Sequence, residues 1–90
     1  MTEEIKDIKF VEREWTGTEW AGEEDEVLKF KVDGDDVEVW IAHPSRVKRE
    51  GVDEITIVWN GAVDFEGTFK EFRQEYPELA KEVKAISYYL

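Results

Sequence analysis

Carboxylates are the side chains of this sequence that are numerous enough to suggest chemistry. The chain has 23 Asp and Glu against 12 Lys and Arg, which gives a formal net charge of -11. Glu12 and Glu14 have the composition of an acid–base pair, but with 23 acids such pairs arise by chance. "DGDD" at 33–36 matches half of a calcium loop, yet Val37 and Val39 stand where further oxygen ligands are required. We therefore interpret "DGDD" as a turn and expect no metal site.

The usual nucleophiles and bases are scarce. His43 is the only histidine, and no acid stands near it at a spacing that would orient it. Ser45 and Ser87 lack the flanking glycines of a nucleophile elbow. The absence of cysteine removes thiol nucleophiles, disulfides and cysteine-bound zinc together. We expect no enzyme activity, no catalytic residues and no cofactor.

The negative charge is concentrated in the first half of the chain. Residues 1–42 hold 14 acids and 5 bases, a balance of -9, whereas residues 43–90 hold 9 acids and 7 bases, a balance of -2. This balance disfavours direct contact with nucleic acid or anionic membranes and favours a basic protein partner. The candidate acidic binding surface consists of Glu12, Glu14, Glu19, Glu23, Glu24, Asp25, Glu26, Asp35, Asp36 and Glu38.

One short run interrupts the acidity. Arg46, Lys48 and Arg49 follow "HPS" at 43–45. The run is typical of a solvated loop whose cations offset acidic neighbours. The alternative is a small contact for a phosphate or another anion, but no glycine-rich cradle stands beside it.

The elements that must position these residues are mainly strands. Apolar and β-branched residues predict strands over 5–15, 27–32, 37–42 and 54–60. The alternation slips between Phe10 and Val11, which predicts a β-bulge. Asp33 and Gly34 tolerate the positive φ of a tight turn, so the second and third strands form an antiparallel hairpin.

A helical pattern follows. Aromatic and aliphatic residues from Phe65 to Val83 recur every three or four positions. Thr68 and Glu71 form a capping box, and Pro77 interrupts the helix after Tyr76. Residues 60–67 are interpreted as a loop and residues 84–90 as a last strand. The order ββββαβ predicts a single α+β domain over residues 1–90. It has two layers: a largely antiparallel sheet of four to five strands, and one Pro-interrupted helix on one face.

One helix covers only one face of such a sheet, so the apolar residues of the other face need an explanation. Trp40 and Val58 fall at outward positions, Trp15 is assigned to the same face, and Trp20 lies in a loop without periodicity. In one interpretation each indole packs across neighbouring strands of its own chain. In the other, these four residues are apolar anchors of a docking surface.

These patterns favour a small acidic, non-enzymatic binding protein that engages a basic protein partner. Its sharpest form is a nucleic-acid-mimicking inhibitor, the strategy of some phage anti-defence proteins. The alternative is a self-associating or computationally designed scaffold without an external ligand, its simplest form a homodimer through the open sheet face. No apolar run approaches the roughly 20 residues of a membrane span, and the polar start is unlike a signal peptide. We therefore expect a soluble, cytoplasmic protein.

Overall fold

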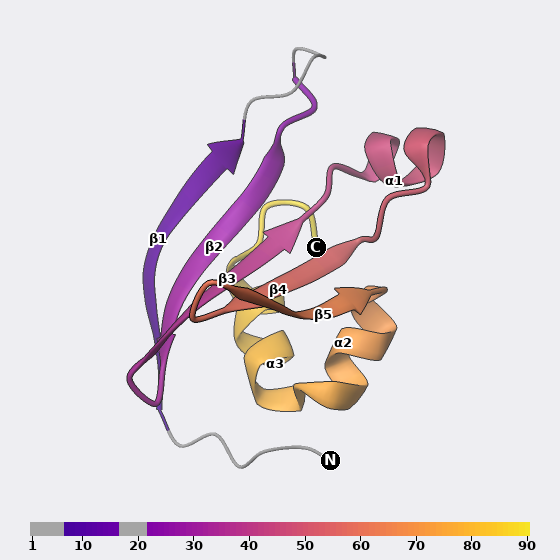
Figure 1. The fold of residues 1–90 in the computed structure, drawn as a ribbon. Helices are drawn as coiled ribbons and strands as arrows, with labels where there is room; N and C mark the ends of the chain where they lie inside the picture. The colour runs from indigo at the N-terminus through magenta and orange to yellow at the C-terminus, as the bar shows by residue number, and fades with distance from the viewer. Residues whose placement is uncertain (1–6, 17–21) are drawn as a thin grey trace.

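The sheet is the frame of the molecule. A computed structural model describes residues 7–16 and 22–90, and Figure 1 shows their fold. The sheet has five strands in the order β1-β2-β3-β4-β5, and each neighbouring pair is antiparallel. The predicted two-layer α+β class is confirmed. The elements are β1 (Ile8–Thr16), β2 (Asp25–Val32), β3 (Asp35–Ile41), α1 (Pro44–Glu50), β4 (Ile55–Trp59), β5 (Ala62–Gly67), α2 (Phe69–Glu75) and α3 (Pro77–Ile86). Ile5 and Lys6, predicted to begin the first strand, lie outside the described residues.

Two tight hairpins set the register of the sheet. Asp33 and Gly34 have φ values of 49° and 87°, which is the left-handed pair of a type I′ turn. The predicted hairpin between the second and third strands is therefore confirmed. Asn60 and Gly61 repeat this geometry, with φ values of 49° and 85°. The interpretation of residues 60–67 as a loop is thus wrong, because this second turn folds β5 back onto β4.

The core lies between one face of the sheet and the pair α2–α3, which Figure 1 shows side by side on that face. The period-two pattern of the predicted strands is confirmed, since their inward residues are all buried there except Trp59, which is partly buried. Phe72, Leu79, Ala80 and Val83 close the core from the helices and are fully buried. We call this face the helix-side face and the opposite face the open face.

The start and the interruption of the helical segment are as predicted. The Thr68 hydroxyl accepts a hydrogen bond from the backbone N–H of Glu71 at 3.2 Å, and the Glu71 carboxylate accepts one from the N–H of Thr68 at 2.9 Å. The capping box is therefore confirmed. α2 ends at Glu75 and α3 begins at Pro77, where a missing N–H costs nothing.

Two further segments differ from the prediction. Residues 44–50 form helix α1: His43 Nδ1 accepts from the Ser45 N–H at 3.0 Å, and Gly51 ends the helix in the left-handed region with φ 69°. The predicted last strand over 84–90 is wrong because α3 continues to Ile86. The backbone N–H of Tyr88 then donates to the Glu26 carboxylate instead of joining a strand ladder.

Candidate binding surface on the open sheet face

Two rows of side chains cross the open face. Residues paired across antiparallel strands share a face, so the strand register defines each row. The first row is Glu14, Val27, Trp40, Thr56 and Glu66. The second row is Glu12, Lys29, Glu38, Val58 and Val63. The predicted outward positions of Trp40 and Val58 are confirmed, and the first row carries a carboxylate at each end with the indole in the middle.

The Trp40 indole is half-buried and held in place by its own chain. Its Nε1–H donates to the Glu38 carboxylate at 2.9 Å. Val27, its cross-strand neighbour, is only 3% exposed although it lies on the open face. The packing of Trp40 across neighbouring strands of its own chain therefore accounts for part of its role. The indole is fixed before any ligand arrives, so a ligand would not have to order it.

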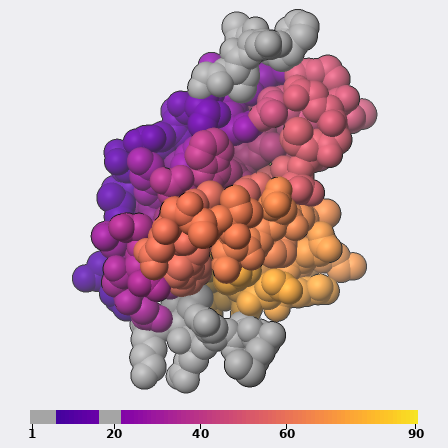
Figure 2. Space-filling view, in the orientation of Figure 1, coloured from indigo at the N-terminus to yellow at the C-terminus, as the bar shows by residue number. Residues whose placement is uncertain are grey.

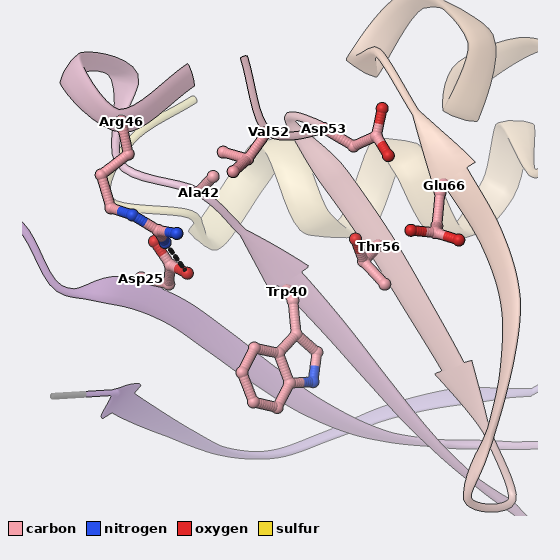
Figure 3. A pocket seen from close by; sticks show the side chains of 8 residues that line it. All are labelled: Asp25, Trp40, Ala42, Arg46, Val52, Asp53, Thr56 and Glu66. Carbon is pink, nitrogen blue, oxygen red and sulfur yellow. Dashed lines mark hydrogen bonds and ion pairs between the residues drawn. The ribbon is translucent and has the colours of Figure 1, made fainter. Parts of the chain in front are cut away.

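A recess of about 300 Å³ lies beside this indole at one end of the open face. Figure 3 shows the side chains that line it: Asp25, Trp40, Ala42, Arg46, Val52, Asp53, Thr56 and Glu66. The strands supply the floor, while α1 and the segment that follows it supply one wall. Figure 2 shows α1, residues 44–50, at one end of the molecule, away from the α2–α3 layer.

Two of the three cations of α1, Arg46 and Arg49, are engaged by acids within the chain. Arg46 forms an ion pair with Asp25 and a second with Glu50 at 3.4 Å. Arg49 contacts Glu23 at 2.7 Å. The hydrogen bond from Arg49 lowers the pKa of Glu23, and hydrogen bonds from Arg46 and Arg49 lower the pKa of Glu50. The run of cations therefore offsets acidic neighbours, but on a helix and not on a loop.

The carboxylates of Asp53 and Glu66, which line the recess, differ from the acids that are paired with α1. Within residues 7–16 and 22–90, no hydrogen bond or ion pair involves the side chain of Asp53 or Glu66. Both residues are exposed, and each borders the recess that contains the Trp40 indole. Two carboxylates beside an aromatic ring suit a guanidinium or ammonium group, which gains both Coulomb attraction and a cation–π contact. The recess is thus chemically suited to a cation.

Most of the predicted acidic residues have partners inside the chain. The Glu14 carboxylate contacts Lys29 Nζ at 2.9 Å, and Asp36 pairs with Lys31. Trp59 Nε1–H donates to Asp35 at 3.0 Å, which lowers the pKa of that carboxyl. Of the other predicted acids, Glu12 is exposed, Glu24 is half-buried and Glu38 accepts a hydrogen bond from Trp40. Glu19 and the predicted apolar anchor Trp20 lie outside the described residues.

Glu26 corrects the predicted acidic surface. Its side chain is fully buried on the helix-side face, because it shares the period-two alternation of Leu28 and Phe30. The carboxylate accepts from Arg13 Nε at 2.7 Å, Ser87 Oγ at 2.6 Å and the Tyr88 N–H at 2.8 Å. It fastens the end of α3 to the sheet and is not available to a partner.

Trp15 is also placed on the wrong face by the sequence pattern. The predicted bulge is confirmed as a register shift between Phe10 and Glu12, and it reverses the faces of the residues that follow. Trp15 consequently pairs with Glu26 on the helix-side face. It packs edge to face against Tyr88 and Tyr89, each at 5.6 Å between ring centroids, and remains 47% exposed.

Sequence reasoning missed Asp53 and Glu66 because the elements that place them were not predicted. Glu66 reaches the open face only through the second hairpin, which pairs it with Thr56. The signal was present, since Asn60-Gly61 between two alternating segments is the usual mark of a type I′ hairpin. Asp53 follows α1, whose Pro44 start and Gly51 end were also readable.

No group of three or more His, Asp or Glu side chains is arranged to hold a metal ion within the described ranges. No helix in that part of the chain is long and apolar enough to cross a membrane. No protein-family model, curated protein or solved structure matches the chain.

Proposed function

We propose that the chain is a small, non-enzymatic binding protein whose open face docks a basic segment of a partner protein. The recess beside Trp40 would receive one Arg or Lys side chain, with the Asp53 and Glu66 carboxylates as its counter-charges. The single observation that supports this is the contrast at the recess: its own cation, Arg46, is already paired, whereas these two carboxylates have no partner in residues 7–16 and 22–90.

The surroundings of the recess favour the same partner chemistry. Charged groups across an interface guide the encounter and select the partner more than they add affinity. The net charge of -11 supplies long-range attraction for a cationic segment. The fixed indole supplies an aromatic anchor of the type common at interface hot spots. The open face would therefore combine long-range attraction for a basic partner, selection of that partner by charge, and an aromatic anchor for it.

The test is a fluorescence anisotropy titration with a labelled peptide of alternating Arg and Ser. We expect saturable binding that weakens steeply between about 50 and 200 mM salt, because counter-charges on exposed groups are screened. The double variant Asp53→Asn/Glu66→Gln should bind about tenfold more weakly, since each lost exposed charge contact is worth up to about 1 kcal/mol.

The matched control is Glu75→Gln/Glu78→Gln, which removes the same charge from exposed positions on α2 and α3. Equal weakening by both double variants would mean that net charge alone drives binding, and the proposed recess would then have no role.

Nucleic-acid mimicry is the narrower form of this proposal. Glu12, Glu14 and Glu38 place carboxylates along the open face; Glu14 pairs with Lys29, and Glu38 accepts from Trp40. A mimic would compete with DNA for its partner, so we expect basic proteins captured on the immobilised chain to be released by added duplex DNA. Retention of the captured proteins at saturating DNA would exclude mimicry but leave the binding proposal intact.

Self-association, as in a scaffold without an external ligand, is the second candidate. It is favoured by the half-buried Trp40 and Val58 at the middle of the open face. Sedimentation of the wild type beside Trp40→Ser distinguishes the two. A dimer that becomes a monomer in the variant supports a homodimer through this face, whereas a monomer in both leaves the face to another protein.

A further inference from the structure

A second hollow lies on the outer side of the helical layer, away from the open face. It has a volume of about 330 Å³ and runs between α2 and α3. Phe69, Pro77 and Ala85 form its apolar lining, and the fully buried Ala80 lies at its base. On α3 the lining residues are connected by steps of three and four positions, which places them along one side of the helix: Pro77, Ala80, Lys81, Lys84 and Ala85. The hollow is therefore an apolar groove between two short helices.

The rim of this groove is cationic. Arg73, Lys81 and Lys84 contribute to the lining, and Lys84 Nζ lies 5.7 Å from the centroid of the Phe69 ring. No ion pair among the described residues involves these three side chains. The charge of the rim is thus available to an anion.

The helical layer differs in charge from the rest of the molecule. Its four cations are balanced by four carboxylates, so residues 69–86 carry no net charge: Lys70, Arg73, Lys81 and Lys84 against Glu71, Glu75, Glu78 and Glu82. None of these carboxylates lines the groove. The lining of the groove therefore carries cations and no carboxylate.

The geometry points to a small amphiphilic anion, an alkyl carboxylate, as the ligand of this groove. Its chain would lie on the apolar lining and its head group would meet Lys81, Lys84 or Arg73. The groove is lined by seven residues and has a volume of about 330 Å³. Its volume falls at the lower end of the range of about 300–1,000 Å³ for small-molecule sites.

The experiment is a ¹⁵N NMR titration with dodecanoate below its micelle concentration. We expect saturable shifts at the backbone amides of Ala80, Lys81, Lys84 and Ala85, with unchanged amides on the open face. Dodecyltrimethylammonium, which has the same chain and the opposite charge, should not produce them. Lys81→Gln/Lys84→Gln should weaken binding about five- to tenfold, in line with the loss of two exposed charge contacts.

Two further variants make the outcome decisive. Lys70→Gln removes an exposed cation that does not line the groove and should leave dodecanoate binding unchanged. Ala85→Glu, at an exposed position, should abolish binding while circular dichroism shows an unchanged fold. Equal binding of both amphiphiles, shifts centred elsewhere, or binding of an acidic amphipathic peptide without binding of dodecanoate would overturn the inference.

Discussion

Two adjacent rows of the sheet carry a carboxylate on opposite faces. Glu26 lies in the row of Trp15, Ile41 and Ile55 on the helix-side face, while Glu66 ends the row of Trp40 on the open face. The first is fully buried and receives donors from β1 and from the end of α3. The second is exposed and borders a recess.

The comparison shows that the surroundings of an acid, and not its abundance in the sequence, decide what it does. A buried carboxylate must be fully hydrogen-bonded to be tolerated, and such a site holds its donors in one arrangement. An exposed carboxylate without an internal partner remains available to an external cation. Glu26 is thus expected to stabilise the fold, and Glu66 to support recognition.

Glu26→Gln should have the largest effect on stability. The neutral amide removes the charge that pairs with Arg13 and turns one acceptor oxygen into a donor that faces other donors. Breaking a buried pair costs about 3–5 kcal/mol, and we expect the lower end because Arg13 is partly exposed. Urea denaturation measures the loss, and a change below about 1 kcal/mol would contradict the assigned role.

Trp15→Ala should have the next largest effect. The variant removes two edge-to-face contacts, to Tyr88 and Tyr89, which are worth about 0.5–1.5 kcal/mol each. We expect a loss of about 2 kcal/mol, together with faster hydrogen exchange at the backbone amides of residues 87–90. Trp15→Phe, which keeps an aromatic ring at this position, should recover part of the stability.

Asp53→Asn/Glu66→Gln should leave stability within about 0.5 kcal/mol of the wild type, as is usual for exposed positions without partners. The same double variant is the one expected to weaken binding of the basic peptide. Urea denaturation and the anisotropy titration, made on the same protein preparation, therefore distinguish carboxylates that stabilise the fold from carboxylates that bind the peptide. A large loss of stability in this double variant would show that Asp53 and Glu66 stabilise the fold.

Acid should loosen α1 slightly. The pKa values of Glu23 and Glu50 are lowered from the ordinary value of 4.5 by hydrogen bonds from Arg49 and Arg46. A lowered pKa in the folded state means that the stabilisation is complete above pH 4.5 and is lost as pH falls through the folded values. Hydrogen exchange at the α1 amides, corrected for intrinsic rates, should show weaker protection below pH 4 than at pH 6. The effect is small because Glu50 is exposed and Glu23 is partly exposed.

Much of the sheet could be predicted from period-two alternation and turn chemistry. The four predicted strands, the bulge after Phe10, the Asp33-Gly34 hairpin, the capping box and the break at Pro77 follow from local rules. The binding surface could not be predicted in the same way. Glu66 acquires its position from β5, and Glu26 acquires its partners from residues about 60 positions later.

Two errors have different physical origins. A bulge reverses the faces of all later residues of a strand, so placing Trp15 requires the exact register and not only the pattern. The segment 84–90 has β-prone residues, but its amides are satisfied by side chains of Glu26 and Ser87. Tertiary contacts thus override local propensity at the end of the chain.

The most direct test of the central claim is the location of the peptide contact. A ¹⁵N NMR titration with the Arg-Ser peptide should shift the amides of Trp40, Thr56 and Glu66 and the indole Nε1–H of Trp40, and leave the amides of α2 and α3 unchanged. Shifts spread over both layers, or confined to residues outside the open face, would contradict docking at the recess.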